Sequence, residues 1–200
     1  MSGPSASTPT HIQYAWRGWI LGLLFLVLAW ERFVSEQDLA PIWLLLVLLG
    51  SGWRLYAGRY IGGHTNSLNM DGAAIAVSGP YLFSRHPLYL ANILTSAGLI
   101  LFANCLPAWG ASVLIVMVCA HHVFLALAEE RFLTESQGEA YLGYLRVTPR
   151  WLGFARQTGG AQGTVAPATA ALTKAWRRQG MNLGKTGMAV LILWVLAQLQ

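Results

Sequence analysis

The longest uncharged stretch of the chain runs from Pro87 to Ala120 and contains 34 residues without a formal charge. A membrane-crossing helix needs about 20 apolar residues, so this stretch suits two short spans. Asn104 to Pro107 supplies turn-forming residues between them, which predicts helices over 87–103 and 107–128. Only 10% of the residues are charged and 55% are hydrophobic, whereas about 25% are charged in soluble domains. The sequence therefore predicts an all-α fold, a polytopic bundle of membrane helices.

Further apolar stretches bring the expected number of transmembrane helices to about five. Residues 14–34 and 39–57 are expected to form a hairpin, and 186–199 either crosses the membrane or lies on its surface as an amphipathic helix. The first stretch has a short uncharged centre, so we expect Arg17 and Arg32 to extend from its ends toward the interface.

These expectations divide the chain into successive parts. They are a disordered N-terminus (1–13), a transmembrane hairpin (14–57), a core with a helical hairpin and a polar site (58–151), a linker (152–179), and a C-terminal transmembrane or interfacial helix (180–200).

The basic residues predict an orientation. If the chain has five spans and a cytoplasmic N-terminus, 12 of its 13 Lys and Arg residues lie on the cytoplasmic side of the membrane. Arg32 alone lies on the outer side, beside Glu31, Glu36 and Asp38. Basic residues favour the cytoplasmic side, so we expect an integral, multi-pass protein with its N-terminus and its polar segments, 54–86 and 129–151, facing the cytoplasm. Basic residues are scattered along the chain, which argues against a nucleic-acid partner.

The first polar constellation runs from Ser78 to Tyr89 and lies at the start of the helix predicted over 87–103. An Arg and a His are costly at the edge of a membrane unless they have a function. Pro87 suits a first helical turn, so Arg85, His86 and Tyr89 would lie at the positive end of the helix, which suits an anionic group. The alternative is a plain interfacial anchor.

The second constellation contains Glu129 and Glu130, then Tyr141 and Tyr144. The two tyrosines are three residues apart and can face one side of a helix. Aromatic faces beside carboxylates suit a cationic ligand, and the alternative is a solvated helix with interfacial tyrosines.

Other chemistries find little support. His121 and His122 are adjacent, so their rings point to different faces, and we expect no metal site there. Cys105 and Cys119 form no CxxC pair. The sequence contains no GxSxG, GxxxxGK[ST] or HExxH motif.

Together the two constellations resemble the isoprenylcysteine carboxyl methyltransferase and phospholipid methyltransferase superfamily of membrane-integral enzymes. The family pattern is a GPY turn, RHPxYxG, a helical hairpin, then EExxLxxxFGxxYxxY and a Pro. The matching residues in this chain are Gly79, Pro80, Tyr81, Arg85, His86, Pro87, Tyr89, Glu129, Glu130, Leu133, Gly138, Tyr141, Tyr144 and Pro149, with Arg54 and Gly62 resembling an upstream Arg-and-Gly stretch. The resemblance covers about residues 50–151, and the chain departs from it at Ala91, Gln137 and Thr148, where Gly, Phe and Val are usual.

The resemblance implies S-adenosylmethionine as the cofactor. It implies that Arg85, His86, Pro87 and Tyr89 hold the cofactor together with Glu129 and Glu130, with Glu130 and Arg85 as the catalytic residues. Gly79 and Tyr81 would shape the pocket rim, and Tyr141 and Tyr144 would close over it.

The function implied is methyl transfer to a lipophilic acceptor, first the carboxylate of a prenylated or lipid-like substrate. The alternatives are N-methylation of a phospholipid amine headgroup, which needs a base such as Glu129 or Glu130, and a non-catalytic membrane protein that keeps the fold. A membrane reductase of the steroid-reductase kind is a further alternative and would need a nicotinamide cofactor. The expected partners are the membrane and a lipid or prenylated small-molecule or peptide substrate.

Overall fold

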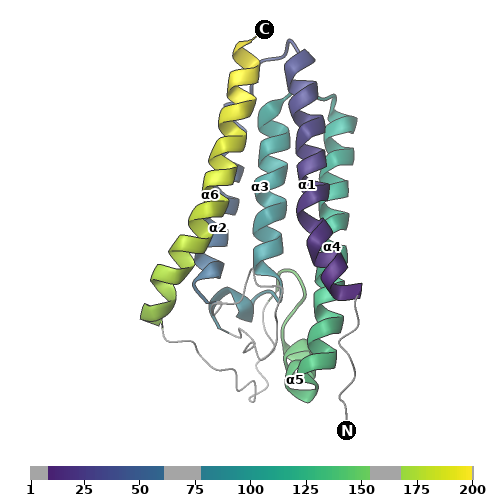
Figure 1. Cartoon of the computed structure of the whole chain (residues 1–200), viewed down its shortest axis with the longest axis vertical. Helices are drawn as coiled ribbons and strands as arrows, with labels where there is room; N and C mark the ends of the chain where they lie inside the picture. The colour runs from purple at the N-terminus through teal and green to yellow at the C-terminus, as the bar shows by residue number, and fades with distance from the viewer. Residues whose placement is uncertain (1–8, 61–77, 154–167, 200) are drawn as a thin grey trace.

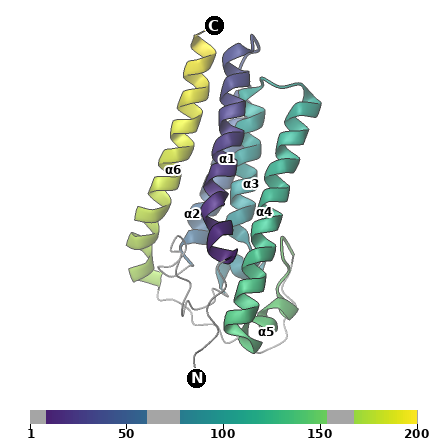
Figure 2. The ribbon, with the colours of Figure 1, turned by 45° about the vertical axis from the view of Figure 1, so that its right-hand side comes forward.

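The structure, a computed structural model, describes residues 9–60, 78–153 and 168–199, and within these ranges it contains helices and no strand. The elements are α1 (Pro9–Val34), η1 (Pro41–Trp43), α2 (Leu44–Gly58), η2 (Gly79–Leu82), α3 (Pro87–Ala103), α4 (Ala108–Gln137), α5 (Glu139–Val147) and α6 (Ala168–Gln198). Helices α1, α2, α3, α4 and α6 run along the long axis, and the short α5 lies at the end of the bundle where α4 finishes (Figures 1 and 2). The predicted all-α fold is confirmed.

Three segments of the described chain are long and apolar enough to cross a membrane: Pro41–Gly58, Ala108–Gln137 and Gln179–Gln198. Helix α3 is also apolar but shorter, at 17 residues. Large apolar side chains point outward along the bundle, among them Leu23, Leu26, Leu48, Leu49 and Val116. Such a surface suits contact with lipid. The expected number of five transmembrane helices stays a prediction.

Helix α3 has the predicted bounds because both of its ends are encoded locally. Pro87 occupies the first turn, where its missing N–H costs no hydrogen bond. Asn104 ends the helix in the left-handed conformation, with φ of 46°, which Asn tolerates better than most residues. Helix α4 continues past the predicted end at 128 to Gln137 and stops at Gly138, whose φ is 55°. Glu129 and Glu130 therefore lie on the same continuous helix as the membrane segment.

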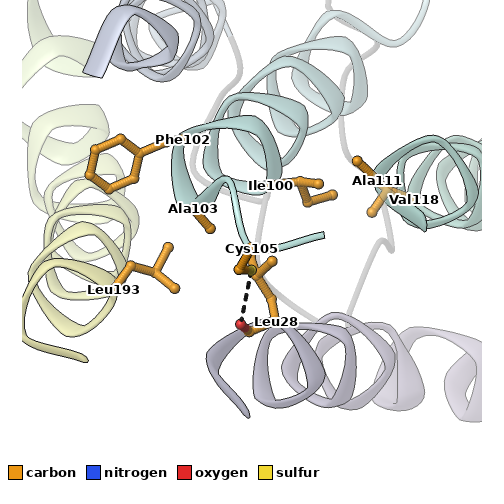
Figure 3. Close-up of a cluster of buried hydrophobic side chains, with 8 residues drawn as sticks. All are labelled: Leu28, Ile100, Phe102, Ala103, Cys105, Ala111, Val118 and Leu193. Carbon is orange, nitrogen blue, oxygen red and sulfur yellow. Dashed lines mark hydrogen bonds between the residues drawn. The ribbon is translucent and has the colours of Figure 1, made fainter. Parts of the chain in front are cut away.

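The apolar core lies between α1, α3, α4 and α6 (Figure 3). Leu28 of α1 packs there with Leu193 of α6, and the α3–α4 turn contributes Cys105, whose thiol donates to the Leu28 carbonyl at 3.8 Å. The buried cluster consists of Leu28, Ile100, Phe102, Ala103, Cys105, Ala111, Val118 and Leu193. These contacts fix α3 in the middle of the bundle, with its N-terminal end left for the polar site.

Helices α2 and α3 approach closely because α2 presents Gly50. A Cβ at Gly50 would lie 2.5 Å from the Thr95 hydroxyl and 2.9 Å from the Ala91 carbonyl oxygen. A Gly in place of Ala91 would allow close packing from the side of α3. In this chain Gly50 of α2 allows that close packing instead. Arg54 of α2 adds a hydrogen bond to Asn92 of α3 near the polar end. Gly62, the other residue of the upstream resemblance, lies outside the described residues.

The expectation that Arg32 extends toward the interface is wrong. Its side chain is fully buried, and Nη1 donates to the carbonyls of Gln37 at 2.6 Å and Ala103 at 3.0 Å, while Nη2 donates to that of Ser35. Ala103 is the last residue of α3, and the last carbonyls of a helix have no partner inside the helix, so a guanidinium that reaches this carbonyl and two more in the chain after α1 is stabilised where it is. Arg32 therefore ties the ends of α1 and α3 together, at the opposite end of the bundle from Pro87.

Two predicted segment boundaries also differ from the structure. Helix α1 begins at Pro9, inside the segment 1–13 that was expected to be disordered, because Pro suits a helix start. Helix α6 begins at Ala168, inside the linker predicted over 152–179. Residues 168–179 are rich in Ala, Leu, Lys, Arg and Gln, which favour helix, and this propensity outweighs the low sequence complexity upstream. Residues 154–167 lie outside the described chain.

Candidate functional site

The two polar constellations, distant in sequence, meet at one end of the bundle. Arg85 and His86 precede α3, Glu129 and Glu130 lie in the last turns of α4, and α5 lies next to the end of α4 at the same end of the bundle (Figure 1). The antiparallel course of α3 and α4 brings the start of one helix next to the end of the other.

Glu130 is the centre of this cluster and is buried. Its Oε1 accepts hydrogen bonds from Arg85 Nη1 at 3.1 Å, His86 Nε2 at 3.1 Å and Arg150 Nε at 3.0 Å. Its Oε2 accepts from Arg150 Nε at 3.2 Å and Nη2 at 2.7 Å. A charge buried at this depth is tolerated because three cationic groups surround it.

Arg85 is directed at the protein rather than at an open space. Beyond Glu130, its Nε donates to the Thr148 carbonyl at 2.6 Å and its Nη2 to the Leu145 carbonyl at 2.7 Å. Its backbone N–H donates to the Pro149 carbonyl at 3.0 Å. Arg85 thus fastens α5 and the chain that follows it to the start of α3.

His86 lies between the two carboxylates, with Nε2 3.1 Å from Glu130 and Nδ1 3.5 Å from Glu129. Only the protonated imidazolium can donate from both nitrogens. Burial of the ring opposes its charging, but the hydrogen bonds to Glu129 and Glu130 outweigh this and raise the pKa of His86 above 6.5. Tyr89, one turn into α3, stacks on the imidazole with ring centroids 5.5 Å apart.

A strap formed by residues 148–153 covers the start of α3. Gly153 N–H donates to the Phe83 carbonyl at 3.1 Å, and the Ser84 hydroxyl donates to the Arg150 carbonyl at 3.3 Å. Trp151 in the strap places its ring 6.1 Å from that of His86.

The sequence interpretation missed Arg150, Ser84 and Trp151 as site residues. Arg150 is the residue directly after Pro149, which ends the second motif, and this position is the one feature of the sequence that points to it.

The tyrosines form a wall between η2 and α5. Tyr144 OH donates to the Tyr81 carbonyl at 2.8 Å, and the Tyr141 and Tyr144 rings lie 6.0 Å apart. All three are buried, and burial first, then the Glu129 charge, raises the pKa of the Tyr81 phenol well above its usual value. The Tyr81 phenol therefore stays protonated at neutral pH. The hydrogen bond from Tyr144 to Tyr81 joins the second predicted motif directly to the first.

Gly79, predicted for the rim, begins η2 with φ of 60°. A Cβ there would lie 2.4 Å from the Tyr60 ring, so a side chain at this position would have to displace that ring. Pro87 is buried at the first turn of α3. The structure thus brings every predicted site residue to the same end of the bundle.

His121 and His122 lie deeper in α4 than the carboxylates. The His122 Nδ1 donates to the Val118 carbonyl at 2.8 Å, and its ring lies 5.7 Å from that of Tyr89. Among the residues that the structure describes, no group of three His, Cys, Asp or Glu side chains could hold a metal ion.

The model of the phospholipid methyltransferase family matches residues 42–140. The chain is similar to the cobalt-zinc-cadmium resistance protein CzcN of Cupriavidus metallidurans, with 30% identity over 130 residues. That alignment covers 65% of this chain and 56% of the relative, so the chain matches little more than half of that protein's length. No solved structure matches the chain.

Proposed function

We propose a function from one premise: residues 42–140 are a phospholipid methyltransferase domain, which belongs to the membrane-integral methyltransferase superfamily. The proposed function is the transfer of a methyl group from S-adenosylmethionine to a lipophilic acceptor. The observation that carries the proposal is the cluster in which Glu130 joins Arg85, His86 and Arg150 at the end of an apolar helix long enough to span a bilayer. A protein rarely places so many charges at that depth without a function.

The residues present fit a cationic, partly polar cofactor. When bound, S-adenosylmethionine supplies an electrophilic methyl group attached to a sulfonium. Glu129 offers a partly exposed carboxylate 3.5 Å from His86 Nδ1, and the His86 ring in turn stacks on the ring of Tyr89. Gly79, His86, Pro87, Tyr89 and Tyr141 complete the residues proposed to shape or hold the cofactor site.

Arg85 and Glu130 act in this proposal as positioning residues. Their contacts hold the strap, α5 and the start of α3 in one arrangement, and an in-line displacement depends on such orientation and on exclusion of water. Because three cations surround Glu130, it is a poor candidate for a base that takes a proton.

Two acceptor classes remain, each with a supporting observation. A carboxylate on a prenylated or lipid-like substrate is already nucleophilic, and Glu130, which is held by three cationic groups, is unsuited to act as a base. A phospholipid amine headgroup is supported by the description of the matched family. In either case the acceptor's apolar part would enter from the bilayer, between the helices.

We also propose that the protein spans the membrane several times, with its N-terminus and its site at the cytoplasmic face. The support is the distribution of basic residues, all but Arg32 of which lie on one side in a five-span arrangement. A soluble cofactor would then reach the site directly.

Calorimetric titration of the full chain in detergent tests the proposal. We expect heat with S-adenosylhomocysteine and none with NADPH. Heat with NADPH alone would favour a reductase, and no heat with either would favour a non-catalytic protein. A labelled-methyl assay on fractionated membrane lipids would then identify the acceptor, because methyl esters are released by mild base whereas N-methyl groups are not.

A further inference from the structure

His122 is a buried polar side chain in the apolar part of α4 for which the proposed function has so far no role. Val118, His122, Ala126 and Glu130 are all buried and follow one another at intervals of four residues, so they share one face of α4. His122 precedes Glu130 by two such intervals, or about 12 Å along the helix. It therefore lies deeper in the bundle than the Glu130 cluster, and it is 1% exposed.

The two ring nitrogens of His122 have different surroundings. Nδ1 lies 2.8 Å from the Val118 carbonyl oxygen, which can only accept, so Nδ1 carries a proton. In the neutral ring Nε2 then holds a lone pair, and it makes no hydrogen bond to any residue that the structure describes. Leaving a buried acceptor without a partner is costly, which indicates that a ligand supplies the missing donor.

The neighbours of the His122 ring favour its neutral form. The ring centroid lies 5.7 Å from that of Tyr89 and 5.3 Å from that of His121, and no carboxylate of the described chain contacts it. Arg54, the charged residue that α2 contributes near this end, is hydrogen-bonded to Asn92, one turn beyond Tyr89. A buried imidazole without an anionic partner is neutral and can take up a proton.

Tyr89 connects His122 to the proposed donor site. Its ring lies 5.5 Å from that of His86 on one side and 5.7 Å from that of His122 on the other. In the proposed function the donor occupies the His86 side, whereas the acceptor enters from the bilayer and so arrives on the His122 side. The reacting group of the acceptor would thus meet Tyr89 after passing His122.

We propose that His122 accepts, through Nε2, the proton of the methyl acceptor, whose nucleophile is therefore an amine rather than a carboxylate. The proposal rests on the proposed function and gives a catalytic task to a residue outside the family pattern. A carboxylate has no proton to give, and the Nε2 lone pair would repel its negative charge. An amine must lose a proton before it can attack, and Glu130, surrounded by cations, is unsuited to take it.

The step balances as follows for a lipid ammonium group. Its proton passes to Nε2, which leaves a neutral amine and an imidazolium whose Nδ1–H stays on the Val118 carbonyl. The amine lone pair forms the new N–C bond while the C–S bond of the methyl donor breaks, and the electron pair of that bond stays on sulfur. The imidazolium gives its proton to water when the products leave.

The test uses labelled-methyl assays of the full chain in detergent, with phosphatidylethanolamine and a prenylated cysteine as separate acceptors. We expect the wild type to methylate the amine lipid. His122→Gln, which keeps a polar side chain but is not basic, should lower kcat for that lipid about 100-fold. The KM for the lipid and the calorimetric affinity for S-adenosylhomocysteine should stay as in the wild type. The matched control is His121→Gln, the adjacent histidine, which should keep the wild-type kcat.

Three results overturn the proposal: a wild type that methylates the prenylated cysteine but not the amine lipid, a His122→Gln variant with the wild-type kcat, or an equal loss of kcat in His121→Gln. The first result needs no variant, so the proposal can be refuted even if His122→Gln fails to fold. Wild-type protein that does not bind S-adenosylhomocysteine refutes the proposed function itself, so the two failures are distinguishable.

Discussion

Removing the Glu130 carboxylate should be among the most damaging single changes to this protein. Glu130→Ala leaves Arg85, His86 and Arg150 without their common partner. Breaking a buried ion pair by deleting one member costs roughly 3–5 kcal/mol. Arg150 is 42% exposed and regains water, so we take the lower value, about 3 kcal/mol.

That loss converts into a measurable shift. For a chain of this size each kcal/mol lowers Tm by roughly 2–4 °C, so we expect a decrease of roughly 6–12 °C. The nine Trp residues allow unfolding in detergent to be followed by intrinsic fluorescence. The matched control is Glu135→Ala, which removes an exposed carboxylate from the same helix. If Glu130→Ala unfolds within about 2 °C of this control, the cluster does not hold the end of the bundle together.

Other predictions test the helix contacts, the histidine and the strap. Gly50→Ala should lower Tm by several degrees because its Cβ would lie 2.7 Å from the Thr95 backbone nitrogen, whereas Gly52→Ala, with nothing within 4 Å, should not; equal Tm values for the two would contradict the close packing of α2 and α3. His86→Gln should destabilise the protein most at low pH: the pKa of His86 is raised in the fold, so its contribution is complete below about 6.5 and is lost as pH rises through the folded-state pKa. The Tm difference from wild type, measured from pH 5.5 to 9, should therefore shrink with pH, and a difference that grows would refute the assignment. Arg150→Lys should lose most of the stabilisation that Arg150 gives, because a lysine cannot reproduce the two-nitrogen contact with Glu130, and unfolding at the wild-type temperature would count against it.

The parts of the fold that local chemistry determines were predictable from the sequence. Pro87 and Asn104 mark the two ends of α3, and the predicted bounds 87–103 are those of the helix. The uncharged stretch likewise indicated membrane helices on either side of one turn. The continuous α4 was harder, because Glu129 and Glu130 end the apolar run but not the helical propensity.

The contacts that depend on tertiary structure were not predictable. The two sequence motifs predict that Arg85 and Glu130 share one site. They do not show that Arg150 completes the cluster, since that depends on how the chain turns after α5. The burial of Arg32 has the same origin: its partners are carbonyls, one of them 71 residues away, and a backbone carbonyl has no signature in a sequence.

The shortness of α3 has a consequence for how a lipid would reach the protein. Its 17 residues extend about 25 Å, less than the roughly 30 Å of a typical hydrocarbon layer. Both of its ends are polar, with His86 at one and Asn104, which donates to the Asp38 carbonyl at 2.8 Å, at the other. Helix α3 packs in the middle of the bundle among the longer helices α1, α4 and α6, so the bilayer meets those helices rather than α3, and the polar start of α3 is set back from their ends. A lipid acceptor would therefore have to reach inward between the helices, and turnover should vary with the acyl-chain length of the host lipid.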